Sequence, residues 1–119
     1  MKTYKDLVVW QKSIELVIAV YELTDKFSKQ EIYGLTSQIR RAAVSVPSNI
    51  AEGKMRGGDI EFKRFVLIAF ASGAELETQI IISKKLPKNA KLDYNKIDSL
   101  LEEIMRMLNK LISQLEPSI

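Results

Sequence analysis

The side chains with the clearest chemical potential in this 119-residue chain are cations in its second quarter. Residues 28–58 carry five Lys or Arg against two Asp or Glu, whereas the remaining segments are balanced, so 28–58 supplies the whole net charge of +3. Clustered cations bind phosphate oxygens, and such binding weakens steeply as the salt concentration rises. The candidate phosphate-binding set draws on this segment and the next, and comprises Arg40, Arg41, Lys54, Arg56, Lys63 and Arg64.

These cations favour contacts with the backbone of RNA or DNA and little reading of base sequence. The aromatic residues among them are Phe62 and Phe65, which helical spacing assigns to apolar faces, so base stacking is not indicated. The same cations also suit an acidic protein partner such as a polymerase. Six cations spread over 25 residues are equally consistent with an ordinary solvated face, and this alternative stays open.

Catalytic chemistry has little support, because the chain contains neither His nor Cys. That composition excludes disulfides, Cys/His zinc sites and an imidazole general base. The closest carboxylates stand one or two positions apart and point to different faces of a helix, which favours surface solubility: Asp59 with Glu61, Glu75 with Glu77, and Glu102 with Glu103. We therefore predict no enzyme, no cofactor and no metal site.

One loop superficially resembles a phosphate-binding loop of nucleotide hydrolases. Residues 53–59 read Gly-Lys-Met-Arg-Gly-Gly-Asp, whereas the Walker pattern needs Gly-Lys-Ser/Thr at its end and a preceding strand. Both requirements are missing. A flexible loop that leads into a helix capped by Asp59 explains the sequence better.

Apolar residues repeat at helical spacing in four segments, and no segment alternates as a strand does. The first predicted helix covers about 5–24, with apolar positions at Leu7, Trp10, Ile14, Val17 and Tyr21. The second begins at Ser28, which forms the pattern of a capping box with Glu31, and ends at Gly53. Its apolar positions are Ile32, Leu35, Ile39, Ala42 and Val46.

The third predicted helix begins at its N-cap Asp59 and ends before Pro87, since the residue before a proline avoids the helical region. Its apolar positions are Phe62, Val66, Ala69, Gly73, Leu76 and Ile80. The fourth begins after Asp93 and ends at Glu116. Its apolar stripe keeps 3-4 spacing throughout, as in a coiled-coil seam: Tyr94, Ile97, Leu101, Ile104, Leu108, Leu111 and Leu115.

Short connections between long helices make neighbours antiparallel. The sequence therefore predicts an all-α, up-down-up-down four-helix bundle, with residues 1–119 as a single domain. Pro47 removes one helical hydrogen bond, and we expect a kink there rather than a break with a restart at Ser45–Ser48, because the apolar face continues past it.

The longest stretches free of charge are ten residues, and no targeting segment is visible. A membrane span needs about 20 apolar residues, so we expect a soluble, cytoplasmic protein without membrane contact.

A group of polar residues surrounds Pro47 and is interpreted mainly as structural: Ser45, Ser48, Asn49 and Glu52. The hydroxyls and Asn49 would bond the backbone groups that the proline leaves without a partner. Glu52 would pair with Arg41 or with an Arg of a neighbouring chain. The alternative is a polar patch at a subunit interface.

Two segments are apolar all around their helices, namely 16–21 and 65–71. A bundle helix buries a stripe only about 100° wide or somewhat more, so these helices carry a second apolar face. Self-association would cover that face, whereas a tightly packed monomer or its loops would be the alternative. The candidate interface residues are Leu16, Ile18, Val20, Leu67, Ile68 and Phe70.

Three stretches of sequence also resemble a known family. They are the run Arg40 to Gly53, which contains Ser-Val-Pro-Ser-Asn-Ile-Ala-Glu-Gly, the segment 62–76, and the opening Tyr4-Lys5-Asp6-Leu7 with Trp10-Gln11-Lys12. Together they closely resemble the four-helix-bundle proteins encoded by intervening sequences inside bacterial 23S ribosomal RNA genes. The accessory variability-determinant proteins of diversity-generating retroelements look like relatives.

The resemblance implies an assembly and a class of role. Family members look like homopentameric barrels of four-helix protomers, and the molecular role of most is unknown. The retroelement relatives bind nucleic acid and a reverse transcriptase through basic surfaces. The resemblance therefore favours a binding function over a catalytic one.

Overall fold

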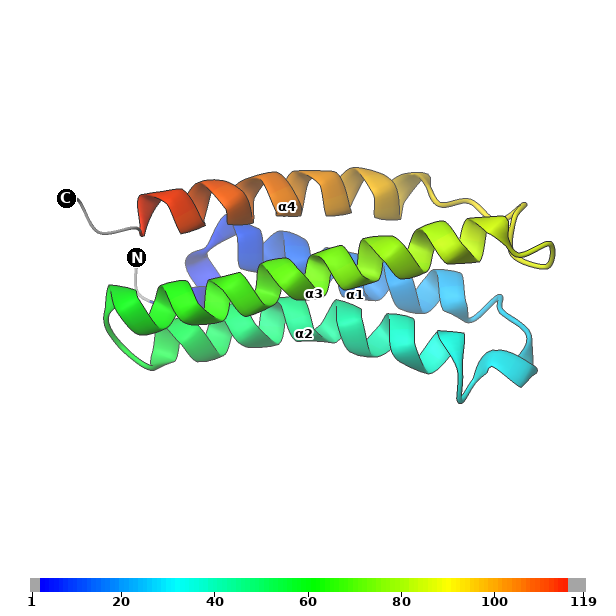
Figure 1. Cartoon of the computed structure of the whole chain (residues 1–119), viewed down its shortest axis with the longest axis horizontal. Coiled ribbons are helices and arrows are strands. Elements are labelled where there is room, and N and C mark those ends of the chain that lie inside the picture. The colour runs from blue at the N-terminus through cyan, green and yellow to red at the C-terminus, as the bar shows by residue number, and fades with distance from the viewer. Residues whose placement is uncertain (1–2, 116–119) are drawn as a thin grey trace.

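Four long helices alternate in direction along the chain and pack as a bundle (Figure 1). The computed structural model describes residues 3–115 and extends about 50 Å along the bundle axis. The helices are α1 (Val8–Thr24), α2 (Leu35–Met55), α3 (Asp59–Lys85) and α4 (Asn95–Gln114), with short 3-10 turns at η1 (Tyr4–Asp6) and η2 (Lys29–Glu31). The described residues contain no strand. The all-α four-helix prediction is confirmed.

Each helix contacts its two neighbours around the bundle, in the order α1, α2, α3, α4 and back to α1. The contact between α2 and α3 is by far the most extensive. The α2–α3 turn lies at the same end of the bundle as the start of α1 and the end of α4, whereas the other two connections lie at the opposite end (Figure 1).

The apolar repeats predicted for the second half of the chain mark the core. On α3 all six predicted positions, from Phe62 to Ile80, are buried. On α4 the first five positions of the stripe are buried, from Tyr94 to Leu108, and Leu111 and Leu115 are half-buried. The predicted end at Glu116 lies outside the described residues.

The apolar repeat predicted on α1 is not its most buried one, although Leu7, Trp10 and Val17 pack against the core. None of its five residues is fully buried, and Ile14 and Tyr21 are exposed. The core face of α1 is the adjacent stripe Val9, Leu16, Val20 and Leu23, with the small Ser13 between. The hydroxyl of Ser13 donates to the Val9 carbonyl at 2.6 Å, which satisfies it inside the core. An apolar helix can place either stripe inward, and packing selected the one that sequence spacing did not single out.

The beginning of α2 also differs from the prediction. Ser28 accepts a hydrogen bond from the Gln30 amide at 3.2 Å and begins only the 3-10 turn η2. The carboxylate of Glu31 accepts from the Leu35 amide at 3.3 Å instead of returning to Ser28. The capping box is therefore absent at this point, and α2 begins at Leu35 rather than at Ser28.

The turn between α2 and α3 is made by glycines further along than expected. Gly53 is buried within α2, which continues to Met55. Gly57 and Gly58 have φ angles of +81° and +82°, which L side chains rarely adopt, and they reverse the chain. Gly58 is the N-cap of α3, so the prediction of Asp59 as N-cap is wrong by one residue.

Pro47 lies inside α2, which continues through it as one helix. The alternative of a break and restart is therefore excluded, and the continuous helix is consistent with the expected kink. Pro47 itself is buried against the neighbouring helices.

Helix α3 is long and apolar enough to cross a membrane by length and composition alone. A single helix of this kind is weak evidence for a membrane span. Only 39% of its most apolar stretch is buried inside the bundle, so much of its apolar surface faces outward.

A buried hydroxyl pair holds the α3–α4 connection. Tyr94 donates to the Asn89 carbonyl at 3.0 Å, and the Ser83 hydroxyl lies 2.6 Å from the Tyr94 oxygen. Replacing Tyr94 by Phe should lower the free energy of unfolding by about 1–3 kcal/mol, because it leaves buried polar groups without a partner. Urea unfolding measures this loss. The control is Tyr33→Phe, whose ring is 98% exposed, and an equal loss in both variants would contradict the prediction.

Candidate nucleic-acid interface

Four of the six candidate cations converge at the α2–α3 turn. Lys54 and Arg56 lie at the end of α2, and Lys63 and Arg64 lie in the first turns of α3. We call these four residues the basic tip. The glycine turn reverses the chain within a few residues, so cations that are ten positions apart in the sequence meet at one end of the bundle (Figure 1).

Two buried phenylalanines contact three of the four cations of the basic tip. The Lys54 ammonium lies 5.1 Å from the ring centre of Phe62. The guanidinium groups of Arg56 and Arg64 lie 5.0 and 5.2 Å from the ring centre of Phe65. Cations are attracted to aromatic faces, so these contacts hold the charges at the end of the core without removing them from solvent.

Neighbouring carboxylates partly balance this charge. Arg56 pairs with Glu52 at 2.8 Å, and Arg64 pairs with Glu61 at 3.4 Å. These pairs are solvent-exposed, and exposed ion pairs contribute only about 0–1 kcal/mol. A phosphate can therefore replace either carboxylate at little cost.

Arg40 and Arg41 are not part of the basic tip. Arg40 stands 14 positions before Lys54 on α2, which at a rise of about 1.5 Å per residue separates them by about 21 Å. Its guanidinium donates to Thr24 Oγ1 at 2.8 Å and to Asp25 Oδ1 at 2.9 Å, and it lies 4.3 Å from the Tyr21 ring centre. Arg40 thus ties α2 to the end of α1. The six predicted cations therefore do not form one patch, and phosphate binding by any of them stays a prediction.

Of the polar residues around Pro47, Ser45 joins α2 to α3. The Ser45 hydroxyl lies 2.8 Å from the Ser72 hydroxyl, and the Asn49 amide donates to the carbonyl and hydroxyl of Ser45 at 2.8 and 2.9 Å. Asn49 therefore does not bond the backbone carbonyl that Pro47 leaves without a donor. Its side chain bonds Ser45 instead, the residue one helical turn before it. Ser48 is exposed.

Glu52, the fourth member of that polar group, pairs with Arg56 within the chain rather than with Arg41, and the alternative partner, an Arg of a neighbouring chain, stays a prediction. The two residues are one helical turn apart, a spacing that brings side chains together on the surface of a helix.

The family model of the 23S rRNA-intervening sequence proteins matches residues 5–110. The chain belongs to this family. The resemblance of the sequence to that family is confirmed, whereas the relation to the retroelement proteins stays a prediction. A search of curated proteins finds no match.

In this 23S rRNA-intervening sequence protein, two of the three stretches that carry the family resemblance, 40–53 and 62–76, lie on α2 and α3 and include contacts between these two helices. A Cβ atom added at Gly53 would lie 2.5 Å from the Cβ of Phe65, and Ser45 bonds Ser72. These residues therefore allow α2 and α3 to pack closely. The basic tip lies at the end of that helix pair.

The residues predicted for a subunit interface fall into three groups by burial. Leu16 and Val20 are completely buried in the core of the protomer, so their assignment to an interface is wrong. Phe70 is half-buried and packs against the core. The remaining predicted positions, Ile18, Leu67 and Ile68, are exposed as an interface requires.

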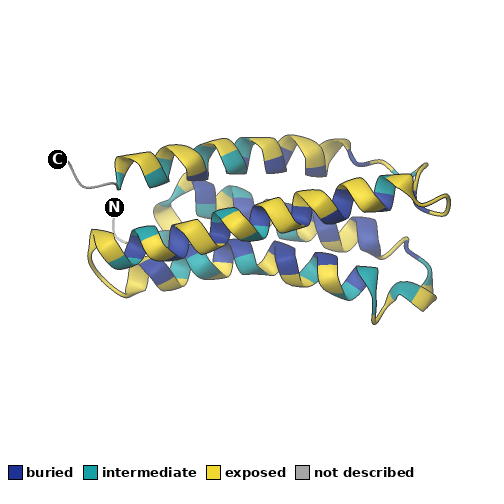
Figure 2. Cartoon of the chain, viewed as in Figure 1, coloured by how far each residue is buried: buried dark blue, intermediate teal, exposed yellow. Residues whose placement is uncertain are grey.

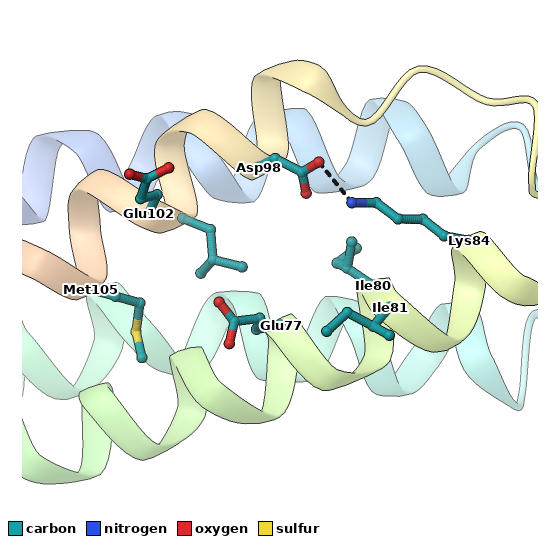
Figure 3. Close-up of a pocket in the computed structure, with 8 residues that line it drawn as sticks. Glu77, Ile80, Ile81, Lys84, Asp98, Glu102 and Met105 are labelled. Carbon is teal, nitrogen blue, oxygen red and sulfur yellow. Dashed lines mark hydrogen bonds and ion pairs between the residues drawn. The ribbon is translucent and has the colours of Figure 1, made fainter.

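A groove of about 370 Å³ between α3 and α4 gathers carboxylates that the sequence does not pair (Figure 3). Glu77 comes from α3, and Asp98 and Glu102 come from α4, above an apolar floor that includes Ile80. Asp98 is bound to Lys84 at 2.7 Å. Among residues 3–115 no three acidic side chains lie close enough to hold a metal ion.

Proposed function

We propose that this 23S rRNA-intervening sequence protein is a non-enzymatic, self-associating bundle that binds the phosphate backbone of RNA or DNA through the basic tip. The observation that carries this proposal is the convergence of Lys54, Arg56, Lys63 and Arg64 at one end of the bundle. Aromatic contacts hold three of them without burying their charge. Base recognition has no support, since Phe62 and Phe65 belong to the core.

Self-association would multiply a weak contact. One tip supplies four cations, and carboxylates partly balance the charge of Arg56 and of Arg64, which supports only modest affinity. Several tips carried by one assembly engage the same nucleic acid with a high effective concentration. A ring, pentameric if it follows the resemblance, would present its tips as a multivalent basic surface in the cytoplasm.

Binding of labelled duplex DNA and structured RNA at several salt concentrations tests the proposal. The logarithm of affinity should fall linearly with the logarithm of salt concentration, because phosphate contacts release counterions. The double variant Lys54→Gln/Arg64→Gln should weaken binding to all sequences together and reduce the slope by about two for each engaged tip.

The matched control is Lys29→Gln/Lys91→Gln, which removes two exposed cations from residues outside the basic tip. This control should bind nearly as the unchanged protein does. Equal weakening by both double variants would show that net charge rather than the tip determines binding. Absence of binding at low salt would overturn the nucleic-acid proposal.

Two exposed apolar side chains at the tip favour a second candidate function, an adaptor for an acidic protein partner. Met55 is 72% exposed and Ile60 is 88% exposed, both beside the cations. Phosphate groups offer no apolar contact to such side chains, whereas protein interfaces combine apolar centres with charged rims. Met55→Ser/Ile60→Ser should leave nucleic-acid affinity unchanged, and a large loss would show that these side chains also contact the nucleic acid.

A further inference from the structure

Helix α3 presents an uncharged stripe to solvent on the side opposite its core face. The stripe repeats at helical spacing, all its members are exposed, and it contains small residues at its centre: Leu67, Ala71, Ala74, Thr78 and Ile82. We call it the α3 ridge. Figure 2 shows exposed residues along most of α3, the helix nearest the viewer. Because the opposite face is already buried in the bundle, α3 has two apolar sides and only one is covered.

The outer side of the α1–α2 pair carries a groove whose shape could receive the α3 ridge. A groove of about 300 Å³ runs between the two helices, and aromatic and aliphatic side chains form most of its lining: Tyr4, Trp10, Ile14, Val17, Val44, Pro47, Ser48 and Ala51. Two of the lining residues, Tyr4 and Trp10, pack edge to face with ring centres 5.3 Å apart. We call this the α1–α2 groove. It contains the less buried apolar face of α1, of which Trp10 and Val17 also pack against the core.

We infer that the α3 ridge of one copy of this protein fills the α1–α2 groove of the next copy. The inference rests on the proposed self-association and names the two surfaces that carry it. A ridge of small side chains allows close approach of a helix to a groove lined by larger ones, as packing at interior density requires. The two surfaces are different, so the contact is head-to-tail, and repetition yields a ring where the rotation closes.

Charges beside the two surfaces are complementary. Arg41 is exposed on α2 near the groove and has no ion pair among the described residues. Glu75 and Glu77 are also exposed and unpaired within residues 3–115, and their helical spacing places them on opposite sides of the α3 ridge. Whichever way α3 of one copy runs along the α1–α2 groove of the next copy, one of these two carboxylates therefore lies on the α2 side of the groove. The same carboxylates oppose the burial of this ridge in a lipid bilayer.

A mixing experiment tests this head-to-tail contact. Ile14→Asp puts a charge in the groove and leaves the ridge intact, whereas Leu67→Asp does the reverse. Each variant alone should be monomeric by light scattering after size exclusion. An equimolar mixture should form a heterodimer and nothing larger, because only one intact groove and one intact ridge remain available.

Second variants and a control keep the result interpretable. Val44→Asp for the groove and Ala71→Glu for the ridge should behave as the first pair does, and far-UV circular dichroism should show that each variant keeps its helices. Ile32→Asp, at a similarly exposed position outside both surfaces, should assemble as the unchanged protein does.

Two outcomes overturn the inference, and they differ in what else they affect. If the unchanged protein is itself monomeric, the proposed self-association fails with it. If the unchanged protein assembles and the groove and ridge variants still assemble, or if mixing does not produce the heterodimer, only the assignment of these surfaces fails.

Discussion

Replacing Leu16 by alanine should lower the free energy of unfolding by about 2–5 kcal/mol, because it leaves a cavity in a core that has no contact with solvent. Leu16 is completely buried on the core face of α1, two positions from Ile18, which is 53% exposed. Ile18→Ala should change the free energy by less than about 0.5 kcal/mol, the usual range for surface substitutions. The two neighbours therefore separate the core face of α1 from its outer face.

Urea unfolding followed by circular dichroism, at one protein concentration for all variants, measures both changes. A small effect of Leu16→Ala would place that residue outside the core and return it to the interface set. Similar losses in both variants would indicate that the face bearing Ile18 is buried as well.

The second large effect concerns the contact between α2 and α3. Gly53→Ala should lower the free energy of unfolding by about 1–3 kcal/mol, the usual cost of overpacking a core. The new Cβ would lie 2.5 Å from the Cβ of Phe65, an atom fixed to the backbone, so the two helices must separate. This cost exceeds the gain of about 1 kcal/mol that alanine brings over glycine in a helix.

Gly73→Ala provides the matched control, since Gly73 is also a buried glycine within a helix. Its added Cβ would overlap the sulfur of Met105, which belongs to a flexible side chain that can move aside. The helix-propensity gain should then nearly offset the displacement, and thermal unfolding should show a clear drop for Gly53→Ala only. A drop of the same size for Gly73→Ala would show that Met105 has no room to move.

Much of the fold can be predicted from the sequence because α3 and α4 each have a dominant apolar repeat. On these helices the spacing of residues such as Phe62, Ile80 and Leu108 identifies the core face directly. Helix α1 is different, since it offers two apolar stripes of similar quality. The stripe that contains Trp10 and Ile14 lines the outer α1–α2 groove. Which of the two stripes faces the core depended on the shapes of the neighbouring helices.

The candidate site was only partly predictable for a related reason. Cations beside a turn stay together in any bundle, so Lys54, Arg56, Lys63 and Arg64 form one group. Arg40 is a cation by sequence, but its partners Thr24 and Asp25 lie on another element, and tertiary contact alone makes it structural. The carboxylates of the α3–α4 groove are likewise distant in sequence.

The sequence by itself determined the four helices, their alternating direction, the absence of His and Cys chemistry, and the location of the excess positive charge. These properties depend on local periodicity, short connections and composition, which act within one segment at a time. Tertiary structure alone decided which stripe of α1 faces the core, which cations remain available and which apolar surfaces stay uncovered. Each of those outcomes depends on how well side chains from different helices fill a shared space, and no single segment carries that information.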